Sequence, residues 1–496
     1  MNITIVQQTI ILFILAYSIV LVFLLKASNK YPIQYQLTEH HHHPKTTGVI
    51  FEFENFQNDL FETVKNVCVN VDLVIVFSET FIYPTIDFAT ISDCRIKLIE
   101  SEKSISDSFE QKNVYNFIQN DYLLILPDYT RIYYPNNLSI IDDLVSRINQ
   151  VKADALLLTF SNDKNKTKCH YFNLDIRRWT LNFVDNGTNC FYRNGFALFL
   201  PKRIFFKLSY PLLRPFLQSF LIQSQILNIK VSIFDSPLFL FSNGLEIFSD
   251  HYTKSKHDHL EKQRLESMYV KLGIKKIVNR TDDSIEWYGC DRNRPRCFGS
   301  ITNDMPDYLI KNRWLPPCCR RNLEITGRYV FNLLEKSNVR YWLEGGSLLG
   351  AARNGKIIDW DYDIDIGIYH EDMHKLSILQ ILFDKPSGYH VEDGQGFVWE
   401  KALEGNFIKI HYSLINRIHV DIFPFVALNG TMTKDTWFEN HPQDMPFPEY
   451  FLKPLKQLSF IGINVSVPNN VEKFLEMKFG SNVIEERRYP NNQTID

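Results

Sequence analysis

Short apolar runs alternate with amphipathic stretches along the first half of the chain. The apolar runs at 48–53, 71–77, 122–128 and 153–160 have the length of buried strands, and helix-like periodicity fills 56–67 and 137–151. Strands that alternate with helices predict a mostly parallel sheet covered on both faces. We therefore expect residues 47–249 to form an α/β stem domain of the Rossmann type.

The second half is organised around residues 341–369, YWLEGGSLLGAARNGKIIDWDYDIDIGIY. This stretch predicts a buried strand, a Gly-Gly-Ser turn, a short helix, a tight Asn-Gly turn and a second strand. On the second strand Asp361, Asp363 and Asp365 alternate with apolar or aromatic residues. A period of two places all three carboxylates on one face.

Three neighbouring carboxylates repel one another unless a cation neutralises them. Hard oxygen ligands suit Mg²⁺ or Mn²⁺. Asp421, alone among apolar residues in His419–Phe423, is a fourth candidate ligand. The alternative is that the acids are solvated residues of an edge strand, where charges discourage aggregation.

A Gly-Ser turn, an Asp-x-Asp strand and a lone Asp on a later strand resemble the order of ligands in nucleotidyltransferase-fold enzymes. The resemblance implies that the turn contacts a phosphate of a nucleotide donor, since glycines let backbone amides approach an anion closely. The predicted donor-binding residues are Gly345, Gly346, Ser347, Arg353 and Lys401. Glu400, next to the last of these, is a further candidate base on the same predicted strand.

Four cysteines lie within thirty residues before this stretch, at Cys290, Cys297, Cys318 and Cys319. They predict either a Cys₄ zinc knuckle or two disulfides, and the spacing does not decide between these sites. Either arrangement would fix nearby arginines, of which Arg296 and Arg320 are candidates for binding an acceptor phosphate. Exposed basic loop residues are the simpler alternative.

The remaining four cysteines are in the stem. Cys169 and Cys190 flank a polar loop and would form a disulfide in an oxidising compartment. Cys68 and Cys94 are expected to be free and buried.

Residues 5–25 carry no charge and are about as long as the ~20 residues that span a bilayer. They predict a membrane anchor after a four-residue cytosolic tail (1–4), with a linker at 26–46. Seven Asn-x-Ser/Thr triplets after residue 25 favour a lumenal body. The charged segment 250–287 is expected to bridge the stem to a catalytic domain at 288–496, with its charges solvated. A net charge of −3 gives no reason to expect a nucleic-acid partner.

Several blocks of the second half resemble the LicD-type phosphotransferase family. They are GCDRNRPRCFG, PPCC, WLEGGSLLGAARNGKIIDWDYDIDIGIY, GFVWEKALEGNF, HVDIFPF, MTKDTW and VPNN. The resemblance implies an α+β nucleotidyltransferase-fold catalytic domain behind a glycosyltransferase-like stem. It also implies that Asp361, Asp363, Asp365 and Asp421 bind metal, and that the four clustered cysteines bind structural zinc.

The same resemblance implies an activity: transfer of ribitol 5-phosphate from CDP-ribitol to a ribitol-phosphate-bearing O-mannosyl glycan of α-dystroglycan, with release of CMP. It further implies a single-pass type II protein of the Golgi membrane that self-associates through its stem. Two alternatives stay open: a transferase that uses CDP-choline or CDP-glycerol, and a catalytically silent glycan-binding or chaperone protein.

Overall fold

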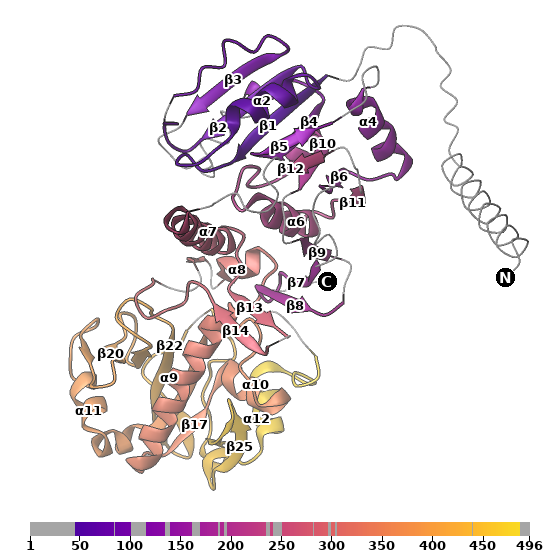
Figure 1. The fold of residues 1–496 in the computed structure, drawn as a ribbon. Helices are drawn as coiled ribbons and strands as arrows, with labels where there is room; N and C mark the ends of the chain where they lie inside the picture. The colour runs from indigo at the N-terminus through magenta and orange to yellow at the C-terminus, as the bar shows by residue number, and fades with distance from the viewer. Residues whose placement is uncertain are drawn as a thin grey trace, which may run out of the picture. The chain divides into compact units, whose positions relative to one another are not determined.

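The structure is a computed structural model, and it describes residues 45–83, 85–100, 116–133, 139–160, 169–186, 189–192, 196–234, 239–241, 250–280, 282–295, 299–302, 305–438 and 440–486 (Figure 1). Residues 45–496 form one compact unit. Three larger sheets carry most of its strands.

The first sheet has seven strands in the order β11-β6-β10-β4-β1-β2-β3. All neighbouring strands are parallel except β10, which is antiparallel to both of its neighbours. The strands are β1 (Thr46–Glu52), β2 (Leu73–Ser78), β3 (Arg95–Glu100), β4 (Tyr122–Pro127), β6 (Ala155–Leu158), β10 (Ala197–Pro201) and β11 (Val231–Phe234). The main helices are α2 (Leu60–Cys68), α4 (Ile140–Gln150) and α6 (Phe216–Ile226).

Successive residues of β1 enter different cores. Ile50 belongs to one apolar cluster, whereas Val49 and Phe51 belong to another. Because successive side chains of a strand point to opposite faces, the sheet is covered on both. The predicted α/β stem, with its alternating strands and helices, is confirmed.

One cysteine prediction in the stem was wrong. Cys68 and Cys94, which we expected to be free, form a disulfide across 26 positions. Cys68 ends α2 and Cys94 directly precedes β3. Since β3 pairs with β2, the strand that follows α2, the sheet itself brings the two thiols together.

A second sheet, β14-β13-β8-β7-β9, was not predicted. It pairs stem strands with strands of the expected bridging segment: β7 (Cys169–Asp175), β8 (Thr180–Val184), β9 (Asn189–Tyr192), β13 (Lys276–Asn279) and β14 (Ser284–Trp287). β7 and β9 are antiparallel neighbours, with Tyr171 opposite Cys190. Cys169 and Cys190 therefore lie on adjacent strands, and their disulfide stays a prediction.

Helix α7 (His251–Lys271) is capped by Asp250, whose carboxylate accepts from the Thr253 amide at 2.8 Å. We expected its charges to be solvated, but Arg264 pairs with the buried Glu54, which also binds Arg214 at 3.0 Å. Burial alone would raise the pKa of Glu54, yet hydrogen bonds from His257 and Arg264 outweigh it and lower that pKa to about 2. The ion pair between Arg264 and Glu54 therefore joins α7 to the stem.

The third sheet has eight strands and follows the path β17-β18-β22-β21-β20-β19, with β23 and β24 attached beyond β22. Its strands are β17 (Tyr341–Leu343), β18 (Asp363–Tyr369), β19 (His390–Glu392), β20 (Val398–Lys401), β21 (Ile408–His411), β22 (His419–Leu428), β23 (Thr431–Thr433) and β24 (Phe447–Pro448). Only β18 and β22 are parallel.

Helices α9 (Pro317–Lys336), α10 (Gly345–Asn354), α11 (Ser377–Phe383) and α12 (Val471–Phe479), with the hairpin of β25 (Lys456–Phe460) and β26 (Ile463–Val467), complete this part. One continuous apolar core joins sheet and helices. It includes Ile364, Ile366 and Ile368 of β18, all 0% exposed. Because these alternate with the aspartates, burial of one face of β18 directs the acids to the other face.

The predicted anchor at 5–25, its tail and nearly all of its linker lie outside the described residues. Within the described part of the chain no helix is both long and apolar enough to cross a bilayer. That finding corrects the predicted location as a single-pass type II protein of the Golgi membrane.

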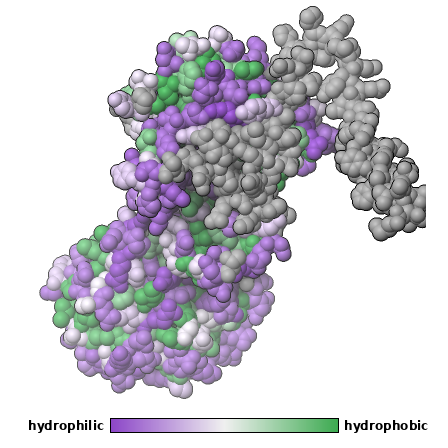
Figure 2. Space-filling model, viewed as in Figure 1, coloured by the Kyte–Doolittle hydropathy of each residue, from purple (hydrophilic) through white to green (hydrophobic). Residues whose placement is uncertain are grey.

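On the face shown in Figure 2, hydrophilic and hydrophobic residues are intermixed.

Candidate active site on strands β18 and β22

The predicted acids meet where β18 and β22 run side by side. In the register of these parallel strands Asp363 lies opposite His419, and Asp365 lies opposite Asp421. Ligand atoms of Asp363, His419 and Asp421 all lie within 4.8 Å of one another. Asp361 lies two residues before the start of β18 and hydrogen bonds to Asp363. Alternation along β18 and the strand pairing therefore gather all four acids that the sequence singled out.

Crowding changes the protonation of these acids. Burial, followed by the negative charge of Asp421, raises the pKa of Asp363 to about 6. Burial, followed by the charge of Asp363, holds the pKa values of Asp361 and Asp365 well above their usual range. A site this rich in carboxylates needs protons or cations to compensate its charge. Its oxygen-rich ligand set fits a hard divalent cation.

The loop before β18 is fastened from several directions. Tyr308 Oη donates to the Trp360 carbonyl at 2.6 Å, and the Leu315 amide donates to the Asp359 carbonyl at 2.9 Å. Arg320 binds the Asp359 carboxylate at 2.8 Å. Arg320, a candidate for the acceptor phosphate, therefore helps to position this loop, and its contact with an acceptor stays a prediction.

Helix α10 begins with the predicted Gly-Gly-Ser, three residues earlier than expected. A Cβ on Gly346 would lie 2.4 Å from Asp361 Oδ2, and one on Gly345 would lie 2.9 Å from Asp365 Oδ2. Ser347 Oγ accepts from the Asp365 amide at 3.0 Å. The structure thus gives these three residues a role in seating the acids, and their contact with a donor phosphate stays a prediction.

Two predicted donor contacts are engaged elsewhere. Arg353 donates to the carbonyls of Val483, Ile484 and Glu486. Lys401 is buried and donates to the Phe383 carbonyl at 3.0 Å. The structure gives both cations other partners, and their contact with a donor stays a prediction.

Glu400 was a candidate base, and it is paired with Arg417 and His411. Burial would raise its pKa, but hydrogen bonding and the charges of these partners lower it. A carboxylate held in its charged form by two partners is a poor proton acceptor. The prediction of Glu400 as a base is therefore corrected.

Two residues of the site were missed. Lys409 on β21 lies opposite Asp421 in the antiparallel β21–β22 pair, and its Nζ is 2.9 Å from Asp421 Oδ2. His419 lies two positions before Asp421. Desolvation, followed by the charge of Lys409, lowers the pKa of His419 to about 3, so the ring is neutral. The period of two in HVD could have identified His419, whereas Lys409 needed the register between strands.

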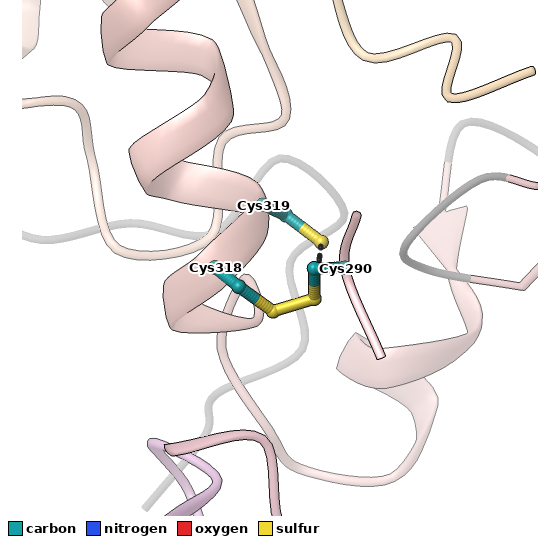
Figure 3. A group of neighbouring side chains, drawn as sticks. All are labelled: Cys290, Cys318 and Cys319. Atoms are coloured by element: carbon teal, nitrogen blue, oxygen red, sulfur yellow. Dashed lines mark hydrogen bonds between the residues drawn. A yellow bond between two sulfur atoms is a disulfide. The ribbon is translucent and has the colours of Figure 1, made fainter. Parts of the chain in front are cut away.

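Three sulfurs converge at the start of α9. Cys290 and Cys318 form a disulfide, and Cys319 Sγ lies 3.9 Å from Cys290 Sγ (Figure 3). Ligand atoms of all three lie within 4.8 Å of one another, and all three side chains are buried. Of the two arrangements that the spacing allowed, zinc or disulfides, the structure contains a disulfide between Cys290 and Cys318. Cys297 and Arg296 lie outside the described residues.

Two family profiles match the chain. Residues 338–470 match "LicD/FKTN/FKRP, nucleotidyltransferase domain". Residues 33–280 match "Fukutin-related protein stem domain". The catalytic-domain profile covers β17 to β26 and includes all four acids, and the stem profile includes the seven-stranded sheet.

Full-length relatives agree with these profiles. "Ribitol 5-phosphate transferase FKRP" of Mus musculus is 37% identical over 453 residues, which is 90% of this chain and 89% of the relative. The Homo sapiens protein of the same name is 36% identical over the same lengths.

A solved mannosyltransferase from Pyrobaculum calidifontis, in complex with GDP-Man and Mn²⁺, is 10% identical with a TM-score of 0.31. It covers 53% of this chain and 74% of that chain, and a likeness this weak supports no argument. The two family profiles and the identity to relatives across 90% of this chain show the family. The chain belongs to the fukutin-related protein family, with a stem domain and a LicD-type nucleotidyltransferase domain.

Proposed function

We infer that this chain is a ribitol 5-phosphate transferase. The observation that carries the inference is 36–37% identity to two proteins of that name across 90% of this chain, together with the convergence of Asp361, Asp363, Asp365 and Asp421. A silent binding protein would have no need for four mutually repelling carboxylates in a single site.

For the donor we propose CDP-ribitol. A hydroxyl of the acceptor attacks the phosphorus that bears ribitol, the bond from that phosphorus to the bridging oxygen of the diphosphate breaks, and CMP leaves. Asp361 takes the hydroxyl proton: a divalent cation held by the neighbouring acids would favour its charged form, and the carboxylate would then act as the base. The acceptor is a ribitol-phosphate-bearing O-mannosyl glycan of α-dystroglycan.

Asp363, Asp365 and Asp421 would hold Mg²⁺ or Mn²⁺. When bound, the cation would neutralise charge on the donor diphosphate and on the leaving group. The fixed loop at 357–362 keeps Asp361 beside these acids, as the contacts of Tyr308 and Arg320 indicate. The start of α10, where a helix carries partial positive charge, lies beside Asp361 and Asp365.

For the cysteine cluster we propose a structural zinc ion. With the Cys290–Cys318 bond reduced, the three buried sulfurs, which lie within 4.8 Å of one another, would fit three of the four ligands of a tetrahedral thiolate site, and Cys297 would supply the fourth. Metal analysis of purified protein should give about one zinc per chain. Less than a tenth of that amount, with no titratable thiols, would establish disulfides instead.

We also propose a homo-oligomer that forms through the stem. Light scattering of the full chain and of a chain without residues 1–287 would test it. A monomeric full chain rejects the proposal.

The transfer assay uses purified chain, a ribitol-phosphate-bearing acceptor and either CDP-ribitol, CDP-glycerol or CDP-choline. We expect a mass gain of one pentitol phosphate with CDP-ribitol alone, and none with EDTA. Asp363→Asn should abolish transfer, whereas Asp258→Asn, on an exposed part of α7, should not. Faster transfer from another donor would correct the substrate. Unchanged transfer by the Asp363 variant would refute the site.

A further inference from the structure

Lys409 reaches into the acid cluster from β21. Its Nζ lies 2.9 and 3.2 Å from the two carboxylate oxygens of Asp421 and 3.0 Å from His419 Nε2. The side chains of Lys409 and Asp421 are only 25% and 7% exposed. Because charge attraction is stronger where water is largely excluded, Lys409 and Asp421 hold each other firmly in this site.

The hydrogen bonds of His419 fix the tautomer and the orientation of its ring. An ammonium only donates, so His419 Nε2 accepts from Lys409. Its Nδ1 lies 3.0 Å from the Arg417 carbonyl, which only accepts, so Nδ1 carries the hydrogen. The backbone thus orients a neutral imidazole whose lone pair faces the ammonium.

The residues that Lys409 binds also belong to the candidate cation site. Asp363, His419 and Asp421 offer ligand atoms within 4.8 Å of one another, and Lys409 bonds to two of these residues. A divalent cation placed there would lie next to the ammonium, and two positive charges at that separation repel each other. Lys409 and the cation therefore compete for Asp421.

We propose that Lys409 changes partner as the site fills. It holds Asp421 while the site is empty. When a divalent cation takes Asp421, the freed ammonium binds the diphosphate of the nucleotide donor. The identity of that donor rests on the proposed function, whereas the coupling requires only a cation and a nucleoside diphosphate.

Two consequences follow for binding. Lysine is a good phosphate ligand as a compact point charge, so its release favours the nucleotide. Because coupling between two ligands is reciprocal, the nucleotide must tighten cation binding by the same factor. Lys409 would then prevent the cation from occupying the site productively without its substrate.

The test measures Mn²⁺ affinity of the full chain by electron paramagnetic resonance, with and without saturating CDP. In the unsubstituted protein we expect CDP to tighten Mn²⁺ binding about tenfold. In Lys409→Met, Mn²⁺ should bind about tenfold more tightly without CDP, and the effect of CDP should largely vanish. Lys456→Met, which removes an exposed lysine of β25, is the matched control and should behave as the unsubstituted protein.

Lys409→Arg gives a prediction of opposite sign. A guanidinium can bind both oxygens of Asp421 in a fixed geometry, so Mn²⁺ without CDP should bind more weakly than in the unsubstituted protein. This variant decides the matter if Lys409→Met fails to fold by circular dichroism. Unchanged Mn²⁺ affinity and unchanged coupling in whichever variants fold would overturn the proposal.

The mass assay separates this proposal from the proposed function. A protein that shows Lys409-dependent coupling but transfers no ribitol phosphate would refute the function and leave the partner exchange in place. A protein that transfers ribitol phosphate without such coupling would support the function and overturn the partner exchange of Lys409.

Discussion

Gly367 lies opposite Trp342 in the antiparallel β17–β18 pair, and a Cβ added to it would lie 2.3 Å from Trp342 Cε2. Trp342 is fully buried, and its Nε1 donates to Glu344 at 2.7 Å. The ring therefore cannot move aside without losing that bond. Close approach of the indole explains why a glycine follows Asp363 and Asp365 on their face of the strand.

We predict that Gly367→Ala lowers the free energy of unfolding by about 3 kcal/mol, because overpacking a rigid core forces neighbours to shift. Urea unfolding would measure it. Gly394→Ala is the control, since nothing lies within 4 Å of a Cβ added there. Equal stability of the two variants would show that the sheet adapts to the methyl group.

Gly346→Ala is predicted to separate activity from stability. The new methyl would lie 2.4 Å from Asp361 Oδ2, the end of a side chain that can rotate away. Alanine also favours helix over glycine, so the melting temperature should not fall. Displacement of a reacting group by about 1 Å can lower the rate about 100-fold. Full transfer activity in a stable variant would exclude a role for this close approach.

The aspartate site was predictable because it depends on local rules. Alternation put Asp363 and Asp365 on one face, and the apolar residues between them showed which face is buried. The same reasoning did not find Lys409, since its position beside the acids depends on the register of two strand pairs, β18–β22 and β21–β22. It also selected Lys401, although Glu400 is the residue of β20 that lies opposite Lys409.

The errors in the stem have the same origin. The pairing of Cys68 with Cys94 follows from the contact between β2 and β3, which neither cysteine's neighbours reveal. The sheet that joins β8 to β13 pairs residues nearly a hundred positions apart. Period and turn chemistry identify elements, whereas tertiary contacts decide which elements are neighbours.

Lys478 and Glu344 form an ion pair in the core, with side chains only 3% and 8% exposed. Lys478→Met should therefore lower the free energy of unfolding by about 3 kcal/mol, because it leaves the carboxylate of Glu344 buried without its cation. Adding Glu344→Gln should restore part of the loss, since the amide oxygen can still accept from Trp342. A double variant whose loss equals the sum of the single losses would show that the two residues are not coupled.

Asp363 is predicted to destabilise the metal-free protein above pH 6. Burial and the charge of Asp421 raise its pKa from 3.8 to about 6. Between these values the folded protein holds the proton more tightly than the unfolded chain, so stability falls as the pH rises through this window. The loss is complete above pH 6 and absent below about pH 4.

Asp363→Asn removes this titration. In EDTA at pH 7.5 the variant should be more stable than the unsubstituted protein by about 1–3 kcal/mol, and the difference should disappear near pH 4. Asp258→Asn, which is exposed, should show no such trend. Parallel stability curves for the Asp363 variant and the unsubstituted protein would contradict the raised pKa. Since the same variant should lose transfer activity, a carboxylate that weakens the metal-free site would also be one that the reaction requires.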